Sequence, residues 1–425
     1  MSPGSHNGDT NGVVGHVRFI SLEYDGSDSD ASALQLVTEL RPEWKEPGSN
    51  IEFVRFTEGI TNTLLKAVNK RAGLSKEDVD NDAVLLRAYG NGTQVLIDRQ
   101  RETENHELLM QYGLAPALLA RFKNGMMYKY IRGKATTPED LRKPSIYLAV
   151  ASRLAEWHAR VPCLADASVH KNGDGVNGNG TNGATNGASP HVIEEEVAPG
   201  KPRPNVWTVM QKWLLALPTE TEAQRERQSK LQGELQKLIA DLSQRPGLGK
   251  NGLVFAHCDL LCGNVIVAPR GVASKSEPIE TVNFIDYEYA TPSPAAFDLA
   301  NHFAEWGGFD CDFSVLPTRA QRLEFIQAYV RAYFELLPAS EKPAEVDEEK
   351  EVAKLFEEVD VFRGLPGFYW GIWSLIQAQI SQIDFDYANY AEVRFGEYWA
   401  WLDEVRGACA AEGRELPLRE RRWAE

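Results

Sequence analysis

One stretch of this chain, residues 253–302, constrains the fold more than any other. It contains the short apolar runs LVFA, NVIV and VNFI, which are typical of buried strands. His257, Asp259 and Asn264 follow the first run, and Asp286 ends the last. Because strands hold the residues at their ends rigidly, we expect these polar side chains to be fixed at one place in the fold.

The spacing of these side chains is typical of phosphoryl transfer. In the protein-kinase template a loop aspartate accepts the proton of the substrate hydroxyl, an asparagine five residues later binds magnesium, and an aspartate on the following strand binds magnesium again. Asp259, Asn264 and Asp286 match that order and spacing. A single aspartate more often caps a turn or ends a strand. The joint pattern, HxDxxxxN and then an apolar strand ending in aspartate, favours a catalytic site.

Composition and charge exclude several classes of protein. The 425 residues are 43% hydrophobic and 25% charged, which allows a sizeable core and two lobes. The formal net charge of -16 argues against a nucleic-acid or anionic-membrane surface, because both need clustered Lys and Arg. An acidic surface suits a cationic small substrate, although acidity that serves only solubility explains the charge equally well.

We expect a cytoplasmic protein with no membrane span. The N-terminal stretch MSPGSHNGDTNGVVGHV has no basic, apolar signal region, and no apolar run approaches the roughly 18 residues that a membrane-spanning helix needs. The cysteines form no CxxC pair, so neither a zinc site nor a disulfide framework is predicted. Cys258 and Cys262, close to Asp259, are expected to be small packing residues.

The N-terminal part of the chain has the pattern of a small mixed lobe. HVRFISLEYD indicates an edge strand, SDASALQLVTEL a short helix, and IEFVRF and NTLLKAVN two strands joined by the turn TEGITN. A kinase covers the nucleotide phosphates with a turn at this point, which makes Gly59, Thr61 and Asn62 candidates. One glycine is a weak signal, and without the downstream motif an ordinary hairpin would be the better interpretation.

Cations for the phosphates are expected on the next elements. The strand DAVLLRAYG carries Arg87, where the kinase template has a lysine, and arginine binds phosphate oxygens in a bidentate way. QVLID predicts another strand, which ends near a second candidate cation, Arg99, and is followed by an amphipathic helix. Glu102 is a candidate ion-pair partner for Arg87, with a solvated helix face as the alternative. LARFKNGMMYKYIRGKAT predicts two short strands, with an adenine-contacting hinge at residues 128–131.

The rest of the chain is predicted to be mainly helical. His158, at the end of the amphipathic helix PSIYLAVASRLAEWHAR, is expected to be a buried structural histidine. The Gly- and Asn-rich residues 165–204 cannot form a core and predict a disordered surface insertion. Two helices are expected on either side of GLPG, near residues 364–367. The basic end RELPLRERRW is most simply a solvated end.

Aromatic residues are concentrated beyond the central stretch. Trp370 and Trp373 are three residues apart and so share a helix face. A large aromatic core explains most of these rings. Carboxylates such as Glu305 and Asp259 favour a second use for some of them, because an aromatic box with acidic groups suits a substituted ammonium ion.

The chain resembles the choline/ethanolamine kinase family, and within it the ethanolamine kinases. The matching stretches lie between about residue 50 and residue 400, in order: TEGITN, VLLRAYGN, IDRQRE, HCDLLCGN, FIDYEYA, FDLANHFAEWGG, FYWGIWSLIQAQIS and YAEVRF. The resemblance implies an α+β, two-lobed protein-kinase-like fold, with a small mixed N-lobe built on an antiparallel sheet and a larger, mainly helical C-lobe. We accordingly divide the chain into a disordered N-terminus (1–14), an N-lobe (15–130), a C-lobe (131–405) and a C-terminal tail (406–425).

The resemblance also implies a role for each site residue. Asp259 would be the catalytic base with His257 bracing its loop, while Asn264 and Asp286 would bind Mg2+. The nucleotide ATP would be held by Gly59, Thr61, Asn62, Arg87, Arg99 and Glu102. The cationic head group would be bound by Glu305, Trp370, Trp373, Phe385 and Tyr390. Two departures put loop geometry in question: Cys258 replaces a common asparagine, and Gly263 replaces a residue that is often basic.

The expected reaction is the phosphorylation of ethanolamine by ATP to phosphoethanolamine, the first step towards phosphatidylethanolamine. A choline kinase or a dual-specificity enzyme is the nearest alternative, because the same pocket takes a trimethylammonium group. An aminoglycoside-type phosphotransferase suits the compact aromatic pocket less well. A pseudokinase is disfavoured by the intact Asp259, Asn264 and Asp286. The sequence leaves open whether the protein forms a homodimer.

Overall fold

A computed structural model describes residues 17–56, 62–90, 92–163, 204–270 and 279–425. The chain forms two compact units. The first contains the described residues of Met1–Gly90 and Pro116–Ile131, and the second those of Asn91–Ala115 and Arg132–Glu425. The predicted N-terminal segment 1–14, Gly59, Thr61 and nearly all of the predicted insertion 165–204 lie outside the described residues.

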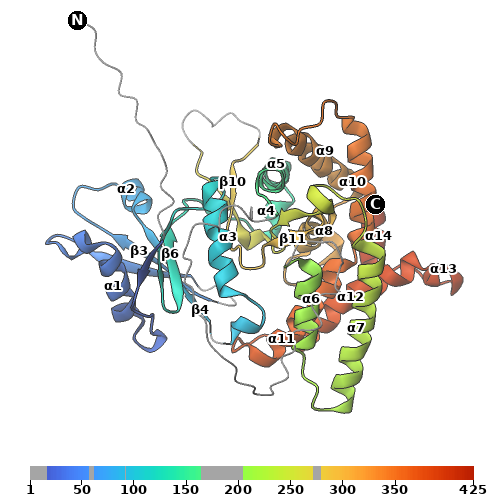
Figure 1. Ribbon diagram of the computed structural model, residues 1–425, viewed down its shortest axis with the longest axis horizontal. Coiled ribbons are helices and arrows are strands. Elements are labelled where there is room, and N and C mark those ends of the chain that lie inside the picture. Colours follow the sequence, from blue (N-terminus) through green and yellow to red (C-terminus); the bar gives the residue numbers. More distant parts are fainter. Residues whose placement is uncertain (1–16, 57–61, 91, 164–203, 271–278) are drawn as a thin grey trace, which may run out of the picture. The chain divides into compact units, whose positions relative to one another are not determined.

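The first unit is built on a six-stranded sheet (Figure 1). Its order is β1-β5-β6-β4-β3-β2, and every pairing is antiparallel except that of β1 with β5. The strands are β1 (Arg18–Ile20), β2 (Ile51–Phe56), β3 (Asn62–Asn69), β4 (Val84–Tyr89), β5 (Leu118–Phe122) and β6 (Gly125–Lys129). These six strands confirm the predicted ones, except for the strand predicted at QVLID, and β1 lies at a sheet edge as predicted.

Two helices accompany this sheet, α1 (Ser29–Leu40) and α2 (Lys76–Asn81). The apolar residues of α1, Leu36 and Val37, are fully buried in a core with Leu86 of β4 and Met127 of β6. Ala33, Leu36 and Val37 are at positions i, i+3 and i+4 and so form one apolar face of α1, which packs against the inward-facing residues of the strands.

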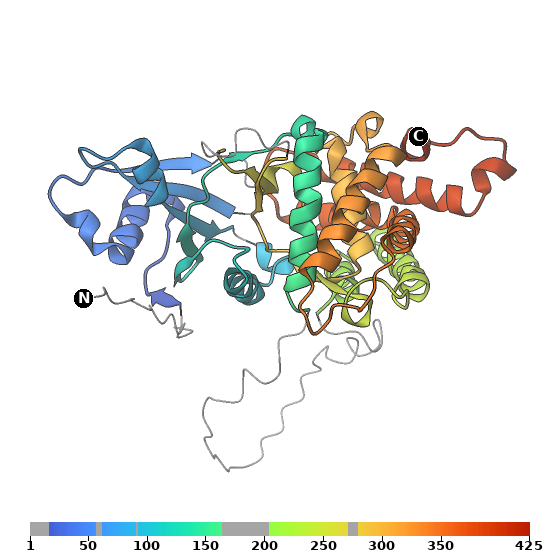
Figure 2. The same ribbon diagram turned by 90° about the horizontal axis from the view of Figure 1, so that it is seen from above.

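The second unit is mainly helical, as predicted (Figure 2). Its helices are α3 (Arg99–Gln111), α4 (Pro138–Leu141), α5 (Pro144–Arg160), α6 (Val206–Leu215), α7 (Glu222–Leu242), α8 (Ala295–Ala304), α9 (Arg319–Leu336), α10 (Glu348–Phe362), α11 (Leu365–Ile380), α12 (Tyr387–Val405), α13 (Ala408–Ala411) and α14 (Leu418–Ala424). Its short strands are β7 (Lys134–Ala135), β8 (Val254–Ala256), β9 (Val265–Val267), β10 (Val282–Phe284) and β11 (Thr291–Ser293). They form the sheets β10-β9-β7 and β11-β8.

Helix α8 lies at the centre of the second unit, since all ten of its residues are buried. A helix that is buried on every side is normally apolar all round. Here three of the ten residues, Asp298, Asn301 and His302, are polar. Buried polar side chains need hydrogen-bond partners, and these three find them in the candidate site described below.

The predicted strand at QVLID is wrong. Thr93–Val95 forms a 3-10 turn, and α3 begins at Arg99 with Asp98 as its cap. The Asp98 carboxylate accepts hydrogen bonds from the backbone N–H groups of Gln100 and Arg101 at 3.1 and 3.2 Å. The carbonyl of Leu96 accepts a bond from the Trp213 indole of α6 at 3.2 Å. The apolar run therefore packs against a helix instead of pairing with a strand.

The prediction of a solvated basic end is also wrong. Residues of RELPLRERRW form α14, in which Arg419, Glu420 and Trp423 are only 2%, 3% and 4% exposed. Arg419 pairs with Glu397, and Glu420 pairs with Arg363. Both partners are more than twenty residues earlier in the chain, so no local sequence pattern indicates these ion pairs. None of the helices in the described part of the chain combines the length and apolar character needed to cross a bilayer.

Candidate active site

The loop after β8 is fixed by hydrogen bonds from α8. The Asp298 carboxylate accepts the backbone N–H groups of His257 and Cys258 at 2.9 and 2.8 Å. Asn301 Nδ2 donates to the carbonyl of Cys258 at 3.0 Å. His302 Nδ1 donates to the carbonyl of Leu260 at 2.8 Å. Positions 298, 301 and 302 lie on one face of a helix, so a single buried helix face sets the backbone of the loop.

Asp298 is itself held as a carboxylate. His158 Nε2 lies 3.0 Å from Asp298 Oδ2, and His158 Nδ1 lies 2.7 Å from the hydroxyl of Tyr329 on α9. Burial alone would raise the pKa of Asp298, but the contacts with His158 and with the loop N–H groups hold that pKa below its usual value. The prediction that His158 is a buried structural histidine is confirmed.

His257 braces the loop from within. Its Nε2 donates to the carbonyl of Ile285 at 3.1 Å, and its Nδ1 accepts the backbone N–H of Asp259 at 3.3 Å. A carbonyl can only accept and an N–H can only donate, so the ring is neutral. Burial lowers the pKa of His257 to about 4, which agrees with a neutral ring. The side chain links the loop to the end of β10.

The Asp259 carboxylate is buried and only partly satisfied. Asn264 Nδ2 donates to the Asp259 carbonyl at 2.7 Å and lies 3.3 Å from Asp259 Oδ2. Asp259 Oδ1 is buried without a hydrogen-bond partner among the described residues. Burial, and then the negative charges of Asp286, Glu305 and Glu288, raise the pKa of Asp259 well above its usual value. A buried acceptor of this kind is suited to receive a proton from a ligand hydroxyl.

Asn264 and Asp286 are brought together by the pairing of β9 with β10. Val265 is opposite Phe284 in this antiparallel pair, and the N–H of Ile285 donates to the carbonyl of Asn264 at 3.0 Å. Asp286, the next residue, has a left-handed backbone with φ of 66°. Strained backbone of this kind is concentrated at functional sites.

The oxygen atoms of this group fit a hard divalent cation. Mg2+ prefers carboxylate and carbonyl oxygens and is often bound by one or two protein side chains together with substrate phosphates. Asn264 and Asp286 supply such oxygens beside the unpartnered Oδ1 of Asp259. Within the described ranges no group of three or more His, Cys, Asp or Glu side chains forms an all-protein cage.

A second charged group lies at the start of α3. Arg99 Nη1 is 2.9 Å from Glu102 Oε2 and 3.4 Å from Glu288 Oε2. Glu102 is buried, so its alternative interpretation as part of a solvated face is wrong. Glu288 was missed by the sequence analysis, although it lies in FIDYEYA two residues after Asp286.

The remaining candidates for nucleotide binding belong to the first unit. Arg87 is a buried residue of β4, and Asn62 begins β3. The pairing of Arg87 with Glu102 stays a prediction. Gly59 and Thr61 lie outside the described residues.

Two tryptophans of α11 donate hydrogen bonds to residues around the candidate site. Trp370 Nε1 donates to Asn301 Oδ1 at 2.8 Å, and Asn301 holds the loop carbonyl of Cys258. Trp373 Nε1 donates to the hydroxyl of Tyr289 at 2.8 Å. The indole rings lie 5.4 Å apart and nearly perpendicular. Because each N–H is used within the protein, the ring faces are the parts that a cation would contact.

The other predicted aromatic residues lie farther along the same cluster. Tyr390 is buried on α12 and stacks on Phe309 with ring centres 5.0 Å apart. Phe385 contacts both rings and is 39% exposed, so it lies at the surface of the cluster. Tyr289 and Phe309 were missed by the sequence analysis. The only signal for them is their place three residues after Asp286 and directly after AEWGG.

Glu305 lies at the end of α8 and is buried. Its Oε1 is 3.4 Å from Arg394 Nη2 of α12. Burial raises the pKa of Glu305 although Arg394 counteracts this effect. The described second unit therefore brings Asp259, Asn264 and Asp286 together with Glu305 and the tryptophans, as the sequence predicts.

A family model described as choline/ethanolamine kinase matches residues 53–399. The chain belongs to this family. It is 32% identical over 385 residues to ethanolamine kinase 2 of Homo sapiens, covering 90% of this chain and 84% of that protein. As a member of the family the chain is a kinase, and the family predicted from the sequence is confirmed.

Solved structures support the fold. An ethanolamine kinase of Plasmodium vivax superposes with a TM-score of 0.62 at 21% identity, covering 87% of this chain and 89% of that chain. LicA, a choline kinase of Streptococcus pneumoniae solved in complex with AMP, superposes with a TM-score of 0.51 at 16% identity, covering 86% and 98%. The predicted α+β fold with a sheet-rich small unit and a helical large unit is confirmed.

Proposed function

We propose that this kinase transfers the γ-phosphoryl group of ATP to the hydroxyl of ethanolamine, giving phosphoethanolamine and ADP. The observation that carries the proposal is the buried Asp259 oxygen without a partner, in an acidic group that includes Glu305. Ethanolamine as the acceptor is supported by the name of the human relative, ethanolamine kinase 2, which is 32% identical to this chain.

Asp259 acts as the base in this reaction. The hydroxyl oxygen of the substrate forms a bond to the γ-phosphorus, the bond to the bridging oxygen of ADP breaks, and the hydroxyl proton passes to Asp259 Oδ1. Burial makes this carboxylate a stronger proton acceptor than a solvated one, because the charged form is disfavoured. Asn264 holds the other oxygen at 3.3 Å and so orients the group.

The phosphates are held by two sets of residues. Asn264 and Asp286 would bind Mg2+, which neutralises charge on the transferred group when it is bound. Arg99, positioned by Glu102 at 2.9 Å, lies in the second unit and would contact phosphate oxygens. Arg87, Gly59, Thr61 and Asn62 stay the sequence-predicted candidates for further contacts with ATP.

The ammonium group of the substrate binds between Glu305 and the aromatic rings. Trp370 and Trp373 are oriented by hydrogen bonds to Asn301 and Tyr289, and each cation–π contact contributes about 0.5–2 kcal/mol depending on desolvation. Tyr390 and Phe385 extend the aromatic wall. The pocket thus holds the cationic end while Asp259 faces the hydroxyl end.

The proposal is tested by comparing kcat/KM for ethanolamine and choline under identical ATP and Mg2+. We expect ethanolamine to be preferred. A preference for choline would assign the chain to the choline kinases, and no turnover of either alcohol would contradict the proposal. The variant Asp259→Ala should lose about 100-fold to 10,000-fold in kcat while it still binds ATP. Near-normal turnover of this variant would remove Asp259 from the role of base.

A further inference from the structure

A row of alternating buried charges runs from Glu305 to the C-terminal helix. Glu305 is 3.4 Å from Arg394, Arg394 Nε is 3.0 Å from Glu397 Oε1, and Glu397 Oε2 is 3.4 Å from Arg419 Nε. All four side chains are at most 7% exposed. Water therefore screens these charges little, so removing one charge alters the electrostatic energy of the neighbouring charge in the row.

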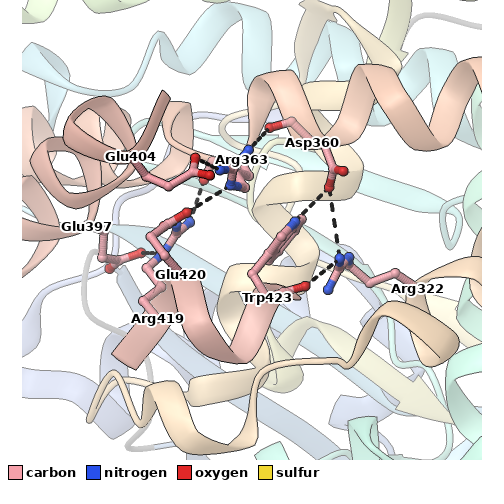
Figure 3. A network of polar contacts seen from close by, with 8 residues as sticks. All are labelled: Arg322, Asp360, Arg363, Glu397, Glu404, Arg419, Glu420 and Trp423. Atoms are coloured by element: carbon pink, nitrogen blue, oxygen red, sulfur yellow. Dashed lines mark hydrogen bonds and ion pairs between the residues drawn. The ribbon is translucent and has the colours of Figure 1, made fainter. Parts of the chain in front are cut away.

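The row continues beyond Arg419 (Figure 3). Arg419 Nη1 lies 2.5 Å from Glu420 Oε1, and Glu420 Oε2 lies 2.9 Å from Arg363 Nε. Arg363 also pairs with Glu404 of α12, and its carbonyl accepts a hydrogen bond from Arg419. The guanidinium of Arg419 is thus held in one orientation by α10, α12 and its own helix.

Helix α14 is anchored independently of this row. Trp423 Nε1 donates to Asp360 Oδ1 at 2.6 Å, and its carbonyl accepts from Arg322 Nη2 at 2.8 Å. The Arg322 guanidinium also lies 3.9 Å from the centre of the Trp423 ring. These contacts fix α14 to α9 and α10, so Arg419 is carried by a rigid support.

The critical residue of the row is Arg394, because two buried carboxylates share it. A buried carboxylate requires a cation or it loses its charge. Glu397 has a second cation in Arg419, whereas Glu305 has Arg394 alone among the ion pairs of the described residues. The charge that Arg419 supplies to Glu397 therefore determines how Arg394 is divided between Glu397 and Glu305.

We propose that Arg419 is a positioning residue for amino-alcohol recognition, acting on Glu305 through Glu397 and Arg394. Without Arg419, Glu397 draws Arg394 towards itself, and Glu305 loses the contact that fixes its orientation and its charge. The substrate ammonium then meets a poorly oriented carboxylate. The inference rests on the proposed function, in which Glu305 binds that ammonium group.

The test compares Arg419→Gln, Arg419→Lys and wild type in steady-state kinetics with ethanolamine and ATP varied separately. We expect Arg419→Gln to raise the ethanolamine KM about 3-fold to 30-fold and to leave the ATP KM unchanged. Arg419→Lys keeps the charge and should recover most of the affinity. A merely structural role would lower kcat through a smaller folded fraction and would leave the ethanolamine KM unchanged, and that result would overturn the inference.

The matched control is Arg421→Gln on the same helix. Arg421 is 44% exposed and pairs with Glu415, which is 75% exposed, so its removal should change neither KM. If Arg421→Gln raised the ethanolamine KM as much as Arg419→Gln does, the loss of positive charge from α14 would explain the change in KM. The specific ion pairs of Arg419 would then not be needed, and the inference would fail.

A second variant covers the case in which Arg419→Gln does not fold. Glu397→Gln with Arg419→Gln removes both charges together, so that Arg394 retains Glu305 and Glu420 retains Arg363. Since no charge at position 397 is left to draw Arg394 away from Glu305, the ethanolamine KM should stay near the wild-type value. A raised ethanolamine KM in this double variant would overturn the inference.

Glu305→Gln separates this inference from the proposed function. If wild type phosphorylates ethanolamine and Glu305→Gln raises its KM, the proposed role of Glu305 stands, and only the Arg419 variants decide the inference. If wild type phosphorylates no amino alcohol, the proposed function itself fails, and the inference fails with it.

Discussion

At the scale of single residues, the backbone at Cys258 and Asp286 has an unusual conformation. Both have left-handed φ values, 63° and 66°, although neither is glycine. Left-handed backbone costs an L-residue about 1–2 kcal/mol, and asparagine and aspartate tolerate it best. Aspartate is therefore compatible with the left-handed backbone at position 286, whereas cysteine at position 258 adopts this conformation at a higher cost in free energy. Asparagine, which the family resemblance gives as common at position 258, suits this conformation.

Cys258→Asn should stabilise the protein without loss of activity. The Cys258 thiol is buried 3.4 Å from Ser293 Oγ and 3.9 Å from the carbonyl of Thr291, groups that an asparagine amide can also bond. We expect the free energy of unfolding to rise by about 1 kcal/mol in chemical denaturation. Cys258→Ala is the control, because alanine keeps the strain and loses the polar contacts. A destabilised Asn variant would contradict this explanation.

Cys258 is also confirmed as a packing residue. It is fully buried, and burial raises the pKa of its thiol well above the usual value, so little thiolate forms near neutral pH.

His302 should make the folded protein sensitive to acid. Its Nδ1 donates to Leu260, and its Nε2 accepts the indole N–H of Trp306 at 3.4 Å, so protonation would set one N–H against another. Burial lowers the pKa of His302 to about 4, from about 6.5 in an unfolded chain. Between these values the unfolded state binds a proton that the folded state does not. Stability contributed by the neutral ring is therefore lost as the pH falls from 6.5 to 4.

His302→Gln measures this contribution. Glutamine can donate to Leu260 and accept from Trp306 but does not titrate. The difference in unfolding free energy between wild type and variant should shift in favour of the variant by about 2 kcal/mol between pH 6.5 and pH 5. Urea denaturation at both pH values gives that difference. A difference that is the same at both pH values would show that His302 does not titrate as proposed.

At the scale of elements, the proposed amino-alcohol site depends on how closely α11 approaches α12. A Cβ on Gly367 of α11 would lie 2.5 Å from the carbonyl oxygen of Arg394 and 3.0 Å from the backbone nitrogen of Tyr398. Both atoms belong to the backbone of α12 and cannot rotate away. The glycine thus lets the helix with Trp370 and Trp373 lie directly against the helix with Arg394 and Tyr390.

Gly367→Ala should therefore damage both stability and recognition. We expect a loss of about 1–3 kcal/mol in unfolding free energy, because overpacking forces the two helices apart. The ethanolamine KM should rise, since Arg394 moves with α12. Gly396→Ala on α12 is the matched control: no atom lies within 4 Å of its added Cβ, and alanine favours helix. Equal destabilisation by both variants would contradict the packing explanation.

The elements differ in how well the sequence predicts them. Helices with a clear apolar face, such as α5 and α9, and strands followed by turn residues, such as β5 and β6, follow from local patterns. The 3-10 turn before Arg99 does not, because its carbonyl at Leu96 bonds Trp213, more than a hundred residues away. Helix α14 was missed for the same reason, since its buried charges are paired across the fold.

The residues of the candidate site also differ in whether a local sequence pattern predicts them. Asp259, Asn264 and Asp286 were predicted because they lie within one short stretch whose spacing is diagnostic. Asp298 and Asn301, which hold that stretch, were not assigned a role, because an aspartate or asparagine on a helix normally faces solvent. Their function follows only from the complete burial of α8.

At the scale of the whole molecule, one long segment lies between helices α5 and α6 of the second unit. Residues 172–189, NGDGVNGNGTNGATNGAS, contain a single strongly apolar residue, Val176. Such a composition cannot bury enough surface to offset the entropy of ordering, so the sequence predicts no contribution of this segment to a folded core. The charged and aromatic residues of the candidate site all come from other parts of the chain.

Deletion of residues 172–189 should therefore leave kcat, both KM values and the thermal unfolding midpoint nearly unchanged. Halving a flexible connection alters its closure free energy by only about 0.6 kcal/mol, and a shorter connection favours the folded state. The control replaces the same residues by a Gly/Ser sequence of equal length. If the deletion lost activity but the replacement kept it, the length of the segment would matter. If both lost activity while the protein remained folded, the Asn- and Gly-rich sequence itself would take part in catalysis, because neither loop length nor core packing would then account for the loss.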